Sequence, residues 1–274
     1  MAKAKEEAAD KNFLSDFDKM INEQFTEVKD MSKEETAVKS FIDTGNYALN
    51  YACSKKLRGG SPVGRITSFW GRSGTGKSLL MAGLCKDQQI DRVFVLSGEG
   101  GGITEELFDF IGAPKEKVRY IPVSTTGNYR INKENGKIEE VADKDMPDKL
   151  DTPTYIYKRG AILMMKIILN QLEYSGNKTK VLILLDSISI LKSVRAFSGT
   201  QDMGATQKGF NDLFSAIDNA IEKTNAIFVF SNKVYSNFGD EYNPFKQAGG
   251  ESVIYNPSLS IKLTALSDSD DISD

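Results

Sequence analysis

A glycine-rich loop carries the clearest chemical signal in the sequence. The spacing G-x-x-x-x-G-K-[ST] is matched by Gly71, Arg72, Ser73, Gly74, Thr75, Gly76, Lys77 and Ser78. Glycines let the backbone curl so that its N–H groups point at phosphate oxygens, and a helix starting at the loop adds its N-terminal dipole. Lys77 is expected to reach the β- and γ-phosphates, and the Ser78 hydroxyl to coordinate Mg²⁺. The loop therefore predicts a nucleoside triphosphate site, against the alternative of a glycine-rich turn.

Two carboxylates are placed to complete such a site. Val181–Leu185 is a run of apolar residues, which predicts a buried strand with Asp186 at its carboxyl end, where open α/β sheets bind ligands. An Asp at a strand end is usually a cap or turn residue, but beside this loop we expect it to hold the hydrated Mg²⁺. Glu99, in a glycine-rich segment after another strand, is the candidate general base that takes a proton from water. Its alternative is a solvated side chain on a flexible loop, and spacing favours neither.

Composition excludes several kinds of chemistry. The chain has no histidine, so proton transfer must use carboxylates, lysine, tyrosine or water. The formal net charge of −3 means that any nucleic-acid contact must depend on local patches. Cys53 and Cys85 are expected to be buried free thiols in a reducing cytoplasm. No apolar run is long enough to span a membrane, and the charged N-terminus lacks the apolar core of a secretory signal.

The elements that must position these residues are short apolar runs alternating with helical patterns. Strands are predicted at Arg65–Trp70, Arg92–Leu96, Val118–Val123, Val181–Leu185, Ala226–Phe230 and Leu259–Leu263, and helices at Tyr47–Ser54, Lys77–Asp87, Thr104–Ile111, Tyr155–Tyr174 and Ala205–Lys223. This alternation predicts an α/β fold with a mostly parallel, twisted sheet flanked by helices. A chain of 274 residues, 40% of them apolar, suits one domain with appendages.

Three segments fall outside this pattern. Residues 1–35 are predicted to form an extension whose amphipathic helix, from Phe13 to Phe25, packs on its own domain or docks on a neighbouring subunit. Residues 125–153 contain the turn signal Asn135-Gly136 between Tyr129–Lys133 and Lys137–Val141, which predicts an inserted hairpin, with a disordered loop as the alternative. Residues 265–274 form an acidic tail that is expected to be disordered.

The order of motifs resembles the RecA-type recombinases, in particular their phage UvsX-like branch. Lys180–Leu191, KVLILLDSISIL, is similar to the Walker B segment of that family, including the Ser after the Asp. Thr200–Gly204 is similar to the end of the first DNA-binding loop, and Asn232 followed by Ala248–Glu251 to the end of the second. Phe108–Val123 is similar to the segment after the catalytic glutamate in the UvsX-like branch. The resemblance spans about residues 40–264.

This resemblance implies a RecA-like P-loop ATPase core, residues 36–264, that uses ATP and Mg²⁺. It makes Glu99 and Lys77 the catalytic residues and implies cytoplasmic action in a bacterium or a phage-infected host. The implied partners are single-stranded DNA, other copies of the chain in a filament or ring, and single-strand-binding and mediator proteins. The implied DNA contacts are Lys192 and Arg195 in a first loop, and Lys233, Tyr235, Phe238, Phe245, Lys246, Gly249 and Gly250 in a second, Lys233–Gly250.

Aromatic side chains with scattered cations suit stacking against bases and contacts to phosphates. Without the resemblance, the second loop is an ordinary loop whose aromatic residues cover a core edge. Asn232 and Lys233 occupy the place of the family's γ-phosphate sensor, where Lys233 replaces a frequent Gln.

UvsX-type proteins continue beyond the point that corresponds to Asp274, with strands and basic residues that reach a neighbour's ATP. A fragment, a split gene product or a minimal relative is therefore expected. The implied function is an ATP-dependent recombinase that forms filaments on single-stranded DNA and promotes homologous pairing and strand exchange in recombination and repair. The alternatives are an ATP-binding recombinase paralogue or mediator with little turnover, and a helicase motor of RecA fold.

Overall fold

A computed structural model describes residues 15–17, 19–21, 23–24, 38, 40–97, 102–122, 128–135, 137–141, 145, 147, 152–159, 179–190, 203–237 and 245–265. The chain divides into two units, residues 1–39 and 40–274. In the first unit, the described residues between 15 and 24 are helical, and Lys19 forms a 3.4 Å ion pair with Asp16 one turn earlier. This agrees with the helix predicted from the apolar spacing of that segment.

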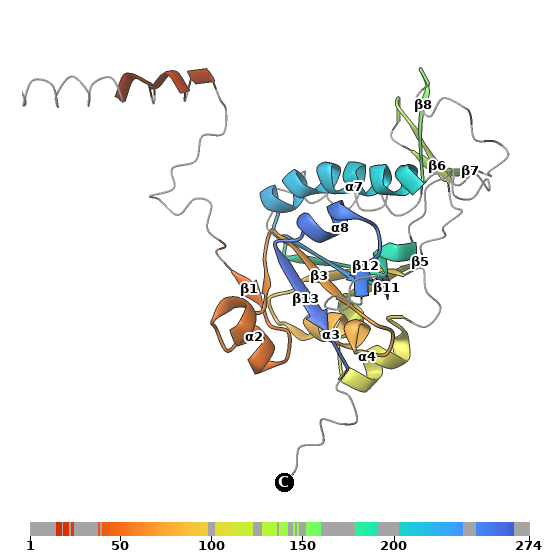
Figure 1. Ribbon diagram of the computed structural model, residues 1–274. Coiled ribbons are helices and arrows are strands. Elements are labelled where there is room, and N and C mark those ends of the chain that lie inside the picture. The colour runs from red at the N-terminus through yellow and green to blue at the C-terminus, as the bar shows by residue number, and fades with distance from the viewer. Residues whose placement is uncertain are drawn as a thin grey trace, which may run out of the picture. The chain divides into compact units, whose positions relative to one another are not determined.

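Six strands form the central sheet of the second unit (Figure 1). In spatial order they are β13 (Leu259–Leu263), β3 (Ile66–Gly71), β10 (Ala226–Asn232), β9 (Val181–Asp186), β4 (Arg92–Ser97) and β5 (Val118–Pro122). Every neighbouring pair in this sheet is parallel. The predicted α/β class with a parallel sheet is therefore confirmed.

Helices cover both faces of this sheet. The face that we call the α7 face carries α7 (Met203–Lys223) and α8 (Glu251–Tyr255), and its core includes Phe214, Phe228 and Phe230. The opposite face, the α3 face, carries α3 (Lys77–Gly83), the short 3₁₀ turn η2 (Leu84–Lys86) and α4 (Glu105–Ile111). Strands β9 and β10 are buried along their whole length, so successive residues of each strand enter alternate cores.

Smaller elements complete the described structure. Strands β1 (Phe41–Ile42) and β2 (Ser61–Pro62) pair antiparallel and flank α2 (Tyr47–Ser54) in sequence. A second antiparallel pair consists of β11 (Val234–Ser236) and β12 (Phe245–Gln247). A three-stranded sheet contains β6 (Asn128–Asn132), β7 (Ile138–Val141) and β8 (Tyr155–Arg159). Turns η3 (Lys115–Lys117) and η5 (Ile188–Ile190) are 3₁₀ helices. The hairpin predicted over residues 129–141 is formed by β6 and β7. No helix among the described residues is both long and apolar enough to cross a membrane.

Two of the predicted helices differ from the structure. The prediction of a helix over Tyr155–Tyr174 is wrong for its first turn, because Tyr155–Arg159 is β8, paired antiparallel with β6; the rest of that range lies outside the described residues. Tyr-Ile-Tyr is a strong strand-forming run, and a ladder to a strand upstream satisfies its backbone groups. The helix predicted at Lys77–Asp87 ends at Gly83 and continues as η2.

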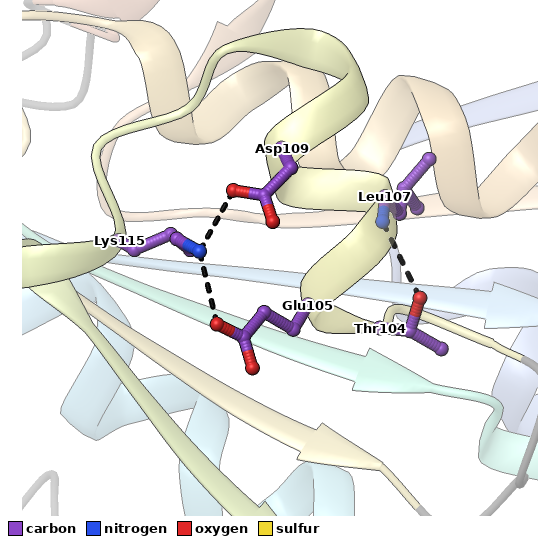
Figure 2. A network of polar contacts seen from close by, with 5 residues as sticks. All are labelled: Thr104, Glu105, Leu107, Asp109 and Lys115. Carbon is purple, nitrogen blue, oxygen red and sulfur yellow. Dashed lines mark hydrogen bonds and ion pairs between the residues drawn. The ribbon is translucent and has the colours of Figure 1, made fainter.

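Helix α4 is fixed at both ends by polar contacts (Figure 2). The Thr104 hydroxyl caps its N-terminus by accepting a 3.3 Å hydrogen bond from the Leu107 N–H. The Lys115 ammonium, beyond its C-terminus, binds the carboxylates of Asp109 at 2.7 Å and Glu105 at 2.9 Å. The hydrogen bond to Asp109, followed by that to Glu105, raises the pKa of Lys115 to about 12. These contacts hold the helix that follows the glycine-rich segment of Glu99.

The two cysteines are free but differ in environment. Cys85 is buried in the core of the α3 face, whereas Cys53 on α2 is partly exposed, so the prediction that both are buried is wrong for Cys53. Burial raises the pKa of the Cys85 thiol to about 12 and raises that of Cys53 as well. The thiolate, not the thiol, is the reactive species.

We expect iodoacetamide to modify native Cys53 at pH 8 while leaving Cys85 unmodified. With a pKa of about 12, roughly one Cys85 thiol in 10⁴ is ionised at that pH, and burial blocks the reagent. Peptide mass mapping after timed labelling measures both sites, and labelling in denaturant provides the control in which both react. Equal native rates would contradict the burial of Cys85.

Candidate functional site

The glycine-rich loop joins β3 to α3 at the carboxyl edge of the sheet. Gly71 ends β3, and a Cβ there would lie 2.2 Å from the backbone oxygen of Leu263, so only glycine fits. Gly74 and Gly76 have φ values of 80° and 85°, in the left-handed region that glycine adopts without a steric penalty. The loop can therefore curl back on itself before α3 begins at Lys77.

The Lys77 side chain lies across this loop. Its ammonium donates hydrogen bonds to the backbone oxygens of Gly71 at 3.0 Å and Arg72 at 2.6 Å. The Thr75 hydroxyl donates to the same Arg72 oxygen at 2.9 Å. A cation is thus held at the loop by neutral carbonyl acceptors, which charged phosphate oxygens could replace with stronger, charge-assisted bonds.

The Asp186 carboxylate is the buried charge nearest to the loop. Its exposed fraction is only 3%, and it lies at the end of β9 on the α3 face. The Ser78 hydroxyl, in the first turn of α3, donates to its Oδ2 at 2.8 Å. The Ser231 hydroxyl, from the intervening strand β10, donates to its Oδ1. The structure therefore brings together the two residues that the sequence predicts as metal ligands.

Two further described residues, Ser97 and Gly102, lie beside this carboxylate. Ser97, the last residue of β4, is the register partner of Asp186 in the sheet. A Cβ on Gly102 would lie 2.4 Å from Asp186 Oδ2, so only glycine fits at this position beside the carboxylate. Glu99 itself lies outside the described residues. The described residues on either side of it in sequence, Ser97 and Gly102, both lie beside Asp186.

Asn232 ends β10, directly after Ser231, and its side chain lies on the opposite face of the strand from that of Ser231. Its amide Nδ2 donates to the backbone oxygen of Ala248 at 2.9 Å and to Gln247 Oε1 at 3.3 Å. Its Oδ1 is buried and has no hydrogen-bond partner among the described residues. The predicted sensor Asn232 therefore anchors the returning end of the β11–β12 hairpin, and the neighbouring Lys233 is exposed.

The β11–β12 hairpin carries part of the predicted second DNA-binding loop. Tyr235 pairs with Lys246 across it, and Tyr235 is half-exposed. The Arg72 guanidinium lies over the Phe245 ring, with Cζ 5.3 Å from the centroid, so the hairpin contacts the glycine-rich loop. The other predicted DNA contacts, Lys192, Arg195 and Phe238, lie outside the described residues.

Gly249 and Gly250 have a structural reason to be glycine. Both have positive φ, and a Cβ on Gly249 would lie 2.7 Å from Val253 Cγ2 and 3.0 Å from the Phe210 ring. The Gly-Gly pair therefore lets the hairpin return close to α7 and α8. No base or phosphate contact is needed to explain it.

Two residues of the site escape motif analysis. Ser231 looks like an ordinary strand residue, and only its place before Asn232 at the strand end marks it. Gly102 ends a run of glycines, a pattern that by itself predicts only a flexible loop. Both are defined by contact with Asp186, which no local pattern reveals.

Comparison with known proteins found no matching family model and no matching curated sequence.

Replacing Ser231 with Ala should lower the free energy of unfolding by about 1.5–3 kcal/mol, because it leaves one oxygen of a buried carboxylate without its hydroxyl donor. Ser61→Ala is the matched control. It removes an equally buried hydroxyl whose 2.9 Å partner, Thr67, is neutral, and about 0.5–1.5 kcal/mol is expected there. Urea unfolding of both variants measures the difference. A loss for Ser231→Ala no larger than for Ser61→Ala would contradict the assigned contact.

Proposed function

We propose that this chain is an ATP-dependent recombinase with a RecA-like core, which forms filaments on single-stranded DNA and promotes homologous pairing and strand exchange. The observation that carries the proposal is the 2.8 Å contact between Ser78 Oγ and Asp186 Oδ2. It joins the loop after β3 to the end of β9 across the intervening strand. A nucleotide site of this type needs a hydroxyl and a carboxylate at one point beside the phosphates.

Phosphate binding is assigned to the loop Gly71–Ser78. Its backbone N–H groups and the N-terminus of α3 supply donors. The Lys77 ammonium would exchange the oxygens of Gly71 and Arg72 for β- and γ-phosphate oxygens. This exchange is favourable because the new acceptors carry charge.

The donor set fits Mg²⁺. The Ser78 hydroxyl and the Asp186 carboxylate are oxygen ligands, which this ion prefers, and one carboxylate is typical where phosphates and water supply the other ligands. The described residues contain no group of three or more acidic or cysteine side chains that would form an all-protein metal cage. Bound here, Mg²⁺ would neutralise charge on the phosphates during transfer.

Hydrolysis is assigned to Glu99. In a chain without histidine, a carboxylate beside the γ-phosphate is the natural acceptor for the proton of the attacking water. The water oxygen forms a bond to the γ-phosphorus, and the bond to the bridging oxygen breaks as ADP leaves. The positions of Ser97 and Gly102 beside Asp186 support this role, because the Glu99 segment lies between them.

DNA binding is assigned to the β11–β12 hairpin and the neighbouring loops. Exposed Tyr235, Lys233 and Lys246 offer a ring for stacking and cations for phosphates. The chain as a whole is mildly acidic, so binding would depend on this local patch rather than on overall charge. Contact between the hairpin and Arg72 supports a connection between nucleotide and DNA sites.

Replacing Lys77 with Ala should weaken ATP binding at least tenfold, because a charge-assisted bond worth about 1.5–3 kcal/mol is lost. Isothermal titration calorimetry with Mg²⁺-ATP measures the change. Lys86→Ala, which removes an exposed cation at the far end of η2, is the control and should bind like the parent chain. Unchanged affinity in Lys77→Ala would overturn the site assignment.

Replacing Glu99 with Gln should reduce ATP turnover by about 10²–10⁴-fold, because the general base is removed, while the affinity for ATP stays within a few-fold. Single-stranded DNA should stimulate turnover of the parent chain, and electron microscopy with an ATP analogue and DNA should show filaments. Undiminished function of Glu99→Gln would favour a mediator with little turnover. Rings would indicate a helicase motor, and monomers with DNA-independent turnover would refute the recombinase assignment.

A further inference from the structure

A basic and aromatic surface covers the outer side of α2 and the loop that follows this helix. It consists of two tyrosines, one leucine and three cations, which we call the α2 surface: Tyr47, Tyr51, Leu57, Lys55, Lys56 and Arg58. The two tyrosines and the leucine are 61%, 55% and 65% exposed, and all three cations are exposed. No acidic residue occurs between positions 44 and 60. Large uncharged side chains and positive charge are therefore concentrated at one place.

The two tyrosine rings project from one side of α2. Tyr47 and Tyr51 are four residues apart, so they lie on the same side of the helix, one turn from each other. Their sequence neighbours Ala48 and Ala52 are exposed as well and are too small to cover a ring. The opposite side of α2 packs against the core of the α3 face through Leu49. The rings are therefore not part of the core.

Two of the cations are held by aromatic rings rather than by carboxylates. The Lys55 ammonium lies 5.4 Å from the centroid of the Tyr51 ring, and the Lys56 ammonium lies 5.0 Å from that of Phe41. Such contacts position an ammonium group without neutralising it. In the part of the chain that the structure describes, neither lysine nor Arg58 forms an ion pair. Three positive charges thus remain for a partner.

The backbone of Lys55 gives a second, independent indication. Its φ of 61° lies in the left-handed region, and Lys55 is the only described residue other than glycine with a positive φ. Its N–H donates to the Tyr51 oxygen at 2.9 Å, which ends α2. Glycine is the usual residue at such a helix end, because a Cβ disfavours this conformation. Stability alone would select glycine here, so the lysine side chain indicates a use for its charge.

The loop that carries the cations is anchored from below by a buried amide. Asn50 is fully buried, and its Nδ2 donates to the Leu57 oxygen at 2.9 Å and to Asp43 Oδ1 at 2.7 Å. Its Oδ1 accepts a 3.0 Å hydrogen bond from the Thr44 N–H. A Cβ on Gly60 would collide with the Thr44 side chain, so the loop returns close to α2. A partner would therefore spend little free energy on ordering this loop.

The α2 surface is separate from the sites proposed above. The Asp43 N–H, just before α2, donates to Asp87 Oδ2 at 2.6 Å. A Cβ on Gly83, the last residue of α3, would lie 3.2 Å from the Thr44 oxygen. The segment before α2 thus lies at the C-terminal end of α3, whereas the loop Gly71–Ser78 leads into its N-terminal end. No residue of the α2 surface belongs to that loop or to the β11–β12 hairpin.

The chemistry of the α2 surface selects among anionic partners. Cations without counter-charges favour a chain of phosphates, and exposed rings favour stacking against bases. A run of carboxylates would use the cations but would leave both rings without a stacking partner. In a duplex, the faces of the bases already stack on one another. A single-stranded nucleic acid presents both phosphates and free base faces, and it therefore matches the whole surface.

We propose that the α2 surface binds a single-stranded nucleic acid, at a place distinct from the β11–β12 hairpin. Bases stack on Tyr47 and Tyr51, and phosphates contact the cations of the loop. The site goes beyond the proposed recombinase, whose strand contacts are assigned to the hairpin and its neighbouring loops. Its existence does not require ATP or filament formation.

Fluorescence anisotropy of a labelled oligothymidylate, without ATP, tests the proposal in a full chain that carries Tyr235→Ala and Lys246→Ala, so that the hairpin contributes less. Adding Tyr47→Ala should weaken binding about 5- to 150-fold, the range for loss of one base–aromatic stack. Adding Lys55→Gly should weaken it and lower the log–log salt slope by about 0.7. Lys137→Ala, which removes an exposed cation beside the β6–β7 turn, is the control and should bind like its parent.

Lys55→Gly also separates binding from folding. Because glycine suits the left-handed conformation, its urea unfolding midpoint should equal or exceed that of the parent chain. If the midpoint falls, Lys55→Asn replaces it, since asparagine also tolerates this conformation. Parent-like binding by the folded Lys55 variant, or by Tyr47→Ala, would overturn the proposal. So would displacement of the oligonucleotide by polyaspartate at equal charge, which would identify an acidic polypeptide as the partner. Loss of ATP binding in Lys77→Ala, or unchanged binding on altering the hairpin alone, concerns the proposed function and not this surface.

Discussion

The carboxylate of Asp186 is a charge buried in the interior, and much of the structure around the site is arranged to satisfy it. Removing a carboxylate from water costs several kcal/mol unless hydrogen bonds replace its hydration. Here the replacements are the hydroxyls of Ser78 and Ser231, which come from α3 and β10. Gly102 leaves space for it. This arrangement requires the strand order β3-β10-β9-β4, because only then do all three segments end at one point.

Successive side chains of β10 point to opposite faces of the sheet, so the end of this one strand contributes to two different surfaces. Ser231 faces α3 and binds Asp186, whereas the next residue, Asn232, faces the hairpin and holds it through the Ala248 oxygen. The fully buried strand therefore sets the spacing between the Asp186 side and the hairpin side of the sheet edge. Neither surface can shift without moving β10, whose core residues Phe228 and Phe230 pack on α7.

The central sheet was predictable because its strands are apolar runs that need no distant information. Val181–Leu185 and Leu259–Leu263 are present as predicted, and Asp186 extends the first of them. The helix prediction was wrong at Tyr155–Arg159 because this segment pairs with β6, a strand further upstream that local periodicity cannot identify. The site divides in the same way. Spacing identified Lys77, Ser78 and Asp186, but Ser231 and Gly102 have no motif and are recognised only by what they touch. Motif spacing also did not reveal the contact between Trp70 and Lys262, because only the register of β3 with β13 pairs them.

Arg72 has contacts on both sides of the loop. Its backbone oxygen accepts hydrogen bonds from Lys77 and Thr75, and its guanidinium lies over Phe245. A triphosphate that draws the Lys77 ammonium away would remove one of the two donors to that oxygen, and so change the constraint on the residue whose guanidinium lies over Phe245. The converse also holds, because linkage between two sites is reciprocal: a base that displaces the guanidinium would alter the loop to which we assign phosphate binding. A contact worth about 0.5–1 kcal/mol at an exposed site limits this effect to a few-fold in affinity. Large coupling would therefore require the anchored hairpin to move as a whole, against the hydrogen bonds of Asn232.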